Sequence, residues 1–174
     1  MNLNLQSTDF ELFGLPPTFV QDREVIDARW KELQREAHPD RFAAQGAAAQ
    51  RIAMQWSVRI NEAYQRLKDP LKRAAYLCEL RGSPVDAQSN TAMPADFLME
   101  QMAWREALDE ARNEEELDQL DAELHRARRE SLQRIEQLLD QRGDAAAAAQ
   151  QVRALMFIER FGHDVQDRFE QLGQ

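Results

Sequence analysis

The fold is decided by residues 22–68, which read DREVIDARWKELQREAHPDRFAAQGAAAQRIAMQWSVRINEAYQRLK. Apolar residues recur at steps of three and four on both sides of His38-Pro39-Asp40, and this spacing places them on one stripe of each of two helices. The stripes are Ile26, Trp30, Leu33 and Ala37 before the tripeptide, and Ala53, Trp56, Ile60, Ala63 and Leu67 after it. Two such helices joined by a short polar loop pack together, so the sequence predicts an antiparallel helical hairpin with the tripeptide at its exposed tip.

The chemistry of this tip is simple. Pro39 disfavours helical backbone at His38, so the first helix is expected to end there, and the second is expected over roughly residues 43–68. Lys31, Arg35 and His38 share a face opposite the apolar stripe. The tip is therefore expected beside a cationic strip and outside any pocket. A helix stop followed by a turn is the plain alternative interpretation.

The residues around the tip resemble the J-domain of DnaJ-type co-chaperones. The second helix contains INEAYQRL at residues 60–67, and Asp69-Pro70, Arg73 and Tyr76 follow it. FELFGLP at residues 10–16 is similar to the short first helix of that family. The resemblance implies that the tip binds a chaperone ATPase of the DnaK class, through His38, Pro39, Asp40, Lys31, Arg35 and Arg41. The chain departs from the family pattern at Ala37, where an aromatic residue is usual.

Composition excludes several classes of protein. The net charge is −9, and residues 81–174 carry 20 of the 31 acidic residues but only 11 of the 22 basic ones. Such an acidic half argues against nucleic-acid binding, which requires neutralisation of phosphates. There is no apolar run near the length of a membrane span, and Cys78 stands alone, so neither a membrane span, a disulfide nor a cysteine metal site is expected. A cytoplasmic monomer without cofactor or metal is the expectation.

Capping signals divide the rest of the chain into helices. A loose start over residues 1–7 precedes a short helix capped by Thr8 or Asp9 that ends at Gly14, and another helix is expected over residues 71–80. After Pro94 the sequence predicts three further helices, in an antiparallel bundle. We expect an all-α protein, with a J-domain at residues 1–80, a linker at 81–94 and a three-helix domain at 95–174. The bundle stripes are Leu117, Leu120, Leu124, Ala127, Ser131, Ile135 and Leu138, and then Leu155, Ile158, Phe161, Val165, Phe169 and Leu172.

The helix expected near residues 95–112 is apolar on two faces. At about 100° per residue, Phe97, Trp104, Leu108 and Ala111 fall on one side, whereas Leu98, Met99 and Met102 fall near the other. A helix in a three-helix bundle needs only one buried face. The second face is either covered by the J-domain, or ordinary surface, or a protein-binding patch in which methionines adapt to the shape of a partner.

This helix resembles the C-terminal domain of HscB-type co-chaperones, the J-proteins of iron–sulfur cluster assembly. The similar stretches are FLMEQ at residues 97–101, the REALDE run at residues 105–110, and YLCELRG at residues 76–82. The resemblance implies two partners: the chaperone ATPase HscA at the J-domain and the iron–sulfur scaffold protein IscU at the bundle. The implied scaffold-binding residues are Leu98, Met99, Met102, Glu106, Glu110 and Phe157. Ala103 departs from the family, since some members carry an acid there.

Three alternatives remain open from the sequence. The first alternative is a general J-domain co-chaperone with another client, and the second is a coiled-coil assembly protein built on the 117–138 stripe. The third alternative is an enzyme that uses His38 and Asp40 as an acid–base pair. The sequence around the tip offers no apolar pocket, nucleophile or glycine-rich phosphate loop, so we expect no catalytic residue.

Overall fold

The computed structural model describes residues 3–173, and its regular elements in that range are all helices, with no strand. This confirms the predicted all-α class. The chain divides into two compact units, one ending at Leu77 and the other beginning at Cys78. The division falls inside helix α4 (Pro70–Leu80).

The first unit begins with the short helix α1 (Asp9–Phe13). The Thr8 side chain accepts a hydrogen bond from the Glu11 amide, and Gly14 ends the helix with φ 63°. Thr8 thus caps the orphan N–H groups of the first turn, and glycine takes the left-handed conformation that a side chain disfavours. Phe10, Leu12 and Phe13 of this helix are buried. Both predicted ends of the helix are confirmed.

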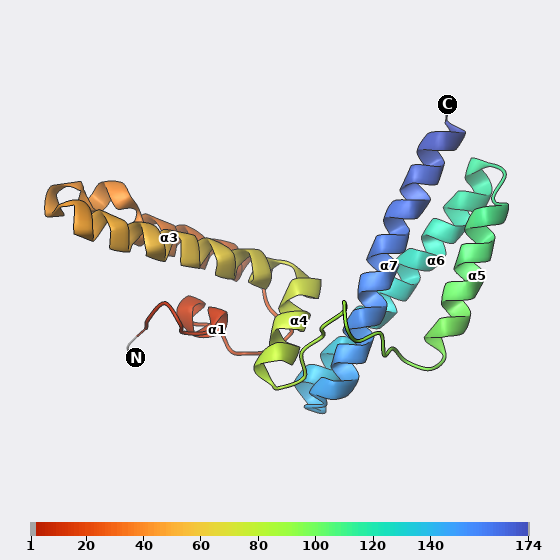
Figure 1. Ribbon diagram of the computed structural model, residues 1–174, viewed down its shortest axis with the longest axis horizontal. Helices are drawn as coiled ribbons and strands as arrows, with labels where there is room; N and C mark the ends of the chain where they lie inside the picture. Colours follow the sequence, from red (N-terminus) through yellow and green to blue (C-terminus); the bar gives the residue numbers. More distant parts are fainter. Residues whose placement is uncertain (1–2, 174) are drawn as a thin grey trace. The chain divides into compact units, whose positions relative to one another are not determined.

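Helices α2 (Arg23–Ala37) and α3 (Ala47–Lys68) form the predicted hairpin (Figure 1). Asp22 caps α2 by accepting from the Glu24 amide. The stripes face one another, with Ile26 and Ile60 almost fully buried. Trp30 of α2 stacks on Tyr64 of α3, with ring centroids 4.5 Å apart. The steps of three and four in the sequence are therefore the contact surface of the hairpin.

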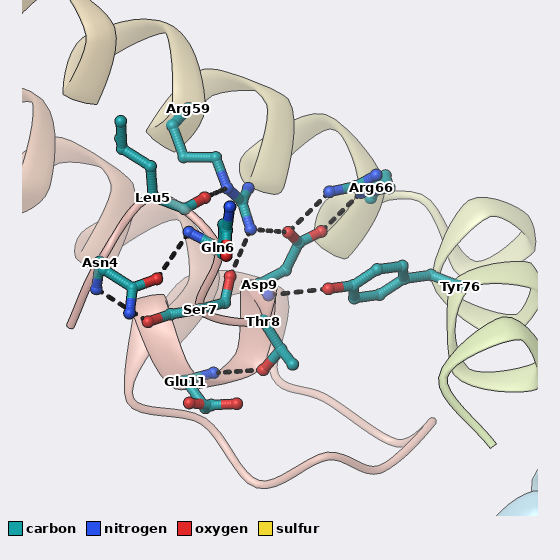
Figure 2. Close-up of polar contacts among 10 residues, drawn as sticks. All are labelled: Asn4, Leu5, Gln6, Ser7, Thr8, Asp9, Glu11, Arg59, Arg66 and Tyr76. Atoms are coloured by element: carbon teal, nitrogen blue, oxygen red, sulfur yellow. Dashed lines mark hydrogen bonds and ion pairs between the residues drawn. The ribbon is translucent and has the colours of Figure 1, made fainter. Parts of the chain in front are cut away.

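A buried carboxylate ties α1 to the hairpin. Asp9 has no exposed surface, and Figure 2 shows it facing two guanidinium groups of α3. Arg66 binds it with two hydrogen bonds, of 2.6 and 2.8 Å, and Arg59 lies 2.8 Å from its Oδ1. The amide of Asp9 also donates to the hydroxyl of Tyr76 in α4, at 3.0 Å. One residue thus holds three helices of the first unit together.

The start of the described range makes hydrogen bonds to α3 that its composition did not predict. Arg59 donates to the carbonyl oxygens of Leu5 and Ser7, at 3.0 and 2.7 Å, and Ser7 is buried (Figure 2). The prediction of a loose segment is therefore wrong for residues 3–7, because a guanidinium far along the chain satisfies their carbonyls. Residues 1 and 2 of that prediction lie outside the described range.

The tip is a helical turn. A 3₁₀ segment, η1 (Pro39–Gln45), starts immediately at the proline, and α3 begins only at Ala47, after Gly46 with φ 101°. The expectation of a loop followed by a helix from about residue 43 was wrong at this point. Proline at the first position of a helical turn has the φ that the turn requires and lacks only an amide that would have had no partner.

The second unit is a bundle of α5 (Phe97–Glu110), α6 (Glu114–Glu136) and α7 (Ala145–Leu172), which lie side by side (Figure 1). Asn113 and Asp144 cap α6 and α7 by accepting from the Glu116 and Ala147 amides. The core combines aromatic and aliphatic side chains from all three helices: Phe97, Trp104, Leu120, Leu124, Ala154, Ile158, Phe161 and Val165.

One core position of α6 differs from prediction. The helix widens into a π-helical turn, η2 (Gln137–Gln141), and the Arg142 amide donates to the Gln137 carbonyl. The wider turn adds a residue to the helix. Leu139 is the buried residue there, with 2% exposure, and the predicted Leu138 is only partly buried.

The segment between α4 and α5 is bound to α7 by a buried arginine. Arg153 donates to the carbonyl oxygens of Val85 and Ala92, at 2.8 and 2.9 Å, and Val85 itself is 7% exposed. Residues 81–94, expected to be a linker, thus contain a stretch that packs as part of the second unit.

Candidate functional site

The first candidate surface is the tip of the hairpin. His38 and Asp40 are exposed, with 57% and 92% of their side-chain surfaces accessible. The Asp40 amide donates to His38 Nδ1 at 3.2 Å, and the Asp40 carboxylate lies 3.7 Å from the same nitrogen. The Arg41 amide donates to the His38 carbonyl at 3.0 Å. The tripeptide is thus a compact turn that presents a carboxylate to solvent.

The cations predicted to flank the tip are all exposed. Lys31 and Arg35 lie on α2, on the side away from the stripe. Arg41 is exposed too, but its Nη1 also donates to the Arg35 carbonyl at 3.4 Å. That carbonyl is one of the last in α2 and has no partner within the helix. Arg41 therefore helps to cap α2 in addition to contributing charge.

Polar pairs between the helices fix the position of α2. Gln34 and Ser57 exchange two hydrogen bonds, of 2.8 Å between the side chains and 3.2 Å to the Ser57 carbonyl. The Tyr64 hydroxyl donates to Asp27 at 2.8 Å. The hydrogen bond from Arg23, and then the one from Tyr64, lowers the pKa of the Asp27 carboxyl. This keeps the Arg23–Asp27 pair ionised. These contacts hold the helix that carries the cationic strip.

An apolar groove of about 460 Å³ lies beside the tip, within the first unit. Ala37 forms part of its wall, where the J-domain family usually has an aromatic residue. The other apolar walls come from Leu3, Leu12, Leu33, Phe42, Ala49, Ile52, Ala53, Trp56 and Ile60. The small side chain at position 37 thus leaves space between α2 and α3.

The second candidate surface is the outer face of α5. Leu98, Met99 and Met102 are exposed by 59%, 72% and 62%, whereas Phe97 and Trp104 of the same helix are buried. Glu106 and Glu110 continue the exposed face toward the end of the helix. Ala103 is exposed beside them. The predicted two-faced helix is present, and its outer face is covered by nothing in the described part of the second unit.

Phe157 differs from the other residues predicted for this surface. It is half-buried, stacks on Phe161 at 5.8 Å and meets the edge of Phe97 at 5.8 Å. These rings belong to the bundle core, with which Phe157 packs. Phe157 therefore supports α5 from behind, and only the part that remains accessible is free for a partner.

No group of three His, Cys, Asp or Glu residues within residues 3–173 is arranged to hold a metal ion. Cys78 is fully buried, and burial raises the pKa of its thiol to about 11, so it is a poor nucleophile. In the described range, no helix is both long enough and apolar enough to cross a membrane.

Known proteins match both the sequence and this architecture. Residues 93–166 match the family model described as HSCB C-terminal oligomerisation domain. The co-chaperone protein HscB homolog of Burkholderia multivorans is 50% identical over 173 residues, which cover 98% of each chain. The chain belongs to the HscB family of co-chaperones. The HscB homolog of Burkholderia cenocepacia is 49% identical over the same share of each chain. The family is one of co-chaperones and not of enzymes.

Solved structures of HscB proteins share the fold. Chaperone HscB from Vibrio cholerae aligns over 95% of this chain and 99% of its own, with 36% identity and a TM-score of 0.79. The human co-chaperone HscB aligns over 99% of this chain and 86% of its own, with 22% identity and a TM-score of 0.87. At that identity the human protein supports the fold alone.

Several residues that shape the sites were missed in the sequence. The role of Pro39 as the first residue of a helical turn had a local signal, because proline is common at that position. The Gln34–Ser57 pair and the contact from Arg153 to Val85 had none, since these partners lie 23 and 68 residues apart. Such contacts depend on how the helices pack, which the spacing of polar residues does not indicate.

Proposed function

We propose that this HscB-family protein links an iron–sulfur scaffold protein of the IscU type to a DnaK-class chaperone ATPase of the HscA type. The first unit stimulates the ATPase through its His38-Pro39-Asp40 tip, and the second unit carries the scaffold on the outer face of α5. The observation that supports the proposal most strongly is the exposed row Leu98, Met99 and Met102 opposite a well-packed core face.

The outer face of α5 has the chemistry of a protein-binding surface. Three large apolar side chains in one row expose area that a partner can remove from water, and methionine adapts to an irregular contact surface. The flanking carboxylates Glu106 and Glu110 favour a partner with basic residues at the rim of the contact. We assign the scaffold to this face, with the accessible part of Phe157 at its border.

The tip acts by shifting a conformational equilibrium in the chaperone. A carboxylate that is 92% exposed, held in a turn beside Lys31 and Arg35, can pair with cations of the partner. Stimulation of the ATPase requires that the tip binds the ATPase-competent state of the chaperone better than its resting state. Because the scaffold is carried on the same chain, its effective concentration at the chaperone rises.

The test is a calorimetric titration of the scaffold protein into the full chain and into a Leu98→Ala/Met99→Ala variant. We expect the variant to lose at least about ten-fold in affinity, since two exposed anchors are removed. Ile52→Ala/Met54→Ala is the matched control, because Ile52 and Met54 are 56% and 53% exposed on the first unit. Equal binding by all three proteins would contradict the assignment.

The role of the tip is tested by measuring how far the Asp40→Asn variant stimulates the ATPase activity of the chaperone. This change removes the charge but keeps the size of the side chain, so we expect stimulation to be lost while scaffold binding persists. Phe157→Ala is kept out of both experiments because it would remove a core contact. A general J-domain co-chaperone with another client is the second candidate: it predicts stimulation lost in Asp40→Asn but no scaffold binding by the wild type.

A further inference from the structure

His38 lies at the tip in a position where its ring acts on the residue two places along the chain. Its Nδ1 accepts a hydrogen bond from the Asp40 amide at 3.2 Å, which makes it the side-chain N-cap of the 3₁₀ turn Pro39–Gln45. A ring nitrogen that accepts a hydrogen bond carries no proton. Nδ1 is therefore the acceptor atom of the ring in this arrangement.

The cap holds the backbone of Asp40 beside the ring. The Asp40 carboxylate lies 3.7 Å from the same Nδ1, and 92% of the side chain is exposed. The carboxylate at the tip is thus accessible to a partner while its own amide is bound to His38.

The polar contacts of His38 are few among the residues that the structure describes. Its Nδ1 accepts from the Asp40 amide, its carbonyl accepts from the Arg41 amide at 3.0 Å, and helix α3 supplies no hydrogen bond or ion pair to it. Asp40 is therefore the residue whose position depends most directly on the His38 ring.

We propose that His38 is a positioning residue, whose ring caps the Asp40 amide and thereby presents the Asp40 carboxylate to the chaperone. This rests on the proposed function of the tip. Docking therefore depends on the hydrogen bond from the Asp40 amide to His38 Nδ1. A direct contact from the imidazole to the partner is not required.

Two substitutions separate the positioning role from a contact role. His38→Asn places Oδ1 where Nδ1 stands, and asparagine is a strong N-cap. His38→Gln carries its amide one bond further, near the place of Nε2, and does not reach the Asp40 amide. In ATPase assays of the full chain at neutral pH, we expect His38→Gln to need about five-fold more protein for half-maximal stimulation, the factor that one cap is worth.

The expected result for His38→Asn is a half-maximal concentration closer to that of the wild type than to that of His38→Gln. Loss of stimulation in His38→Asn equal to or greater than that in His38→Gln would overturn the inference, because it would mean that the ring itself is needed. His125→Gln is the matched control, since His125 is exposed, also pairs with an aspartate and lies in the other unit.

A measurement without the chaperone separates failure of this inference from failure of the proposed function. The hydrogen bonding of the Asp40 amide in the free full-length protein is measured by NMR, from the temperature dependence of its chemical shift. We expect a hydrogen-bonded amide in the wild type, in His38→Asn and in His125→Gln, but not in His38→Gln. An Asp40 amide without a hydrogen bond in the wild type would refute the cap, even if the ATPase is stimulated.

Discussion

Asp9 shows how one residue determines the packing of the first unit. Its carboxylate has no exposed surface, yet it is compensated by two guanidinium groups, those of Arg59 and Arg66. Its hydrogen bond raises the pKa of the Arg66 guanidinium, against the opposing effect of burial. A buried ion with both charges present is tolerated, whereas removal of one charge leaves the other uncompensated.

Asp9→Asn should therefore weaken the first unit. We expect a loss of about 3 kcal/mol in its free energy of unfolding, since two guanidinium groups lose their anion. Hydrogen exchange read out segment by segment measures this, with faster exchange in α1 and α3 and unchanged rates in α6 and α7. Asp121→Asn is the control, because Asp121 pairs with an exposed residue, His125. Similar exchange in the two variants would argue against the structural role of Asp9.

Cys78 gives a prediction about pH. Burial raises the pKa of its thiol from 9.0 to about 11. The Cys78 thiol therefore ionises at a lower pH in the unfolded chain than in the folded one. Its contribution to the free energy of unfolding is fully present below pH 9 and is lost as the pH rises toward 11. We expect Cys78 to account for about 2 to 3 kcal/mol of this loss.

Denaturant unfolding between pH 8 and pH 11 tests this, with Cys78→Ala as the comparison. The variant is less stable by a constant amount at low pH, but its free energy of unfolding falls less steeply. Tyr76 titrates in both proteins, since burial raises the pKa of its hydroxyl as well. Parallel curves for the two proteins would be inconsistent with an abnormal thiol.

At the scale of the element, the hairpin buries Ile26, Ala63 and Leu67 but has an apolar groove that extends from its tip as far as Ile60. The groove of about 460 Å³ beside Ala37 is space that a larger side chain can fill. Filling a cavity with apolar surface stabilises a protein when the backbone does not have to move. An apolar groove and a buried core are thus present in the same two helices.

We expect Ala37→Tyr to stabilise the first unit by about 1 kcal/mol, by placing a ring against Leu33, Phe42 and Trp56. Hydrogen exchange of the α2 and α3 amides measures the gain. Ala44→Tyr in η1 serves as the control, because Ala44 is exposed and does not line the groove. If Ala37→Tyr unfolds more easily than the wild type, the groove is too shallow to receive the ring.

Helices were the best predicted part of the chain, because their signals are local. Thr8, Asp22, Asn113 and Asp144 all cap helices, as their residue types and positions indicate. The row Leu98, Met99 and Met102 also followed from helical spacing alone. Leu139 was missed because Leu138 and Leu139 both continue the stripe from Ile135, by a step of three or of four, and the cap that His38 provides was missed because histidine is not a usual capping residue.

At the scale of the whole molecule, the chain consists of two units whose stabilising contacts are of different kinds. The first depends on a buried ion pair and the second on an aromatic core. The segment after α4 belongs to the second unit because Arg153 binds its carbonyls, with only 5% of the arginine exposed. No signal in the local sequence assigned residues 84–92 to either unit.

Arg153→Lys should release this segment. Lysine keeps the charge but cannot donate in the fork-like geometry of a guanidinium, so at least one carbonyl loses its donor. We expect cleavage by thermolysin within residues 84–92 to accelerate by roughly ten-fold, with the bundle itself remaining resistant. Arg142→Lys, at an exposed helix end, is the control. Unchanged cleavage in Arg153→Lys would show that Val85 alone holds the segment.

The π-helical turn Gln137–Gln141 has a consequence for comparing chain lengths. A turn of this kind contains one residue more than the regular helix it replaces, and the core residues before and after it keep their places. A relative that is one residue shorter between Ile135 and Gly143 is therefore expected to have an unbroken helix there and the same core. In an alignment of two such chains, the gap belongs inside the helix. Placing it in the loop at Gly143 would pair Leu139 with the wrong residue.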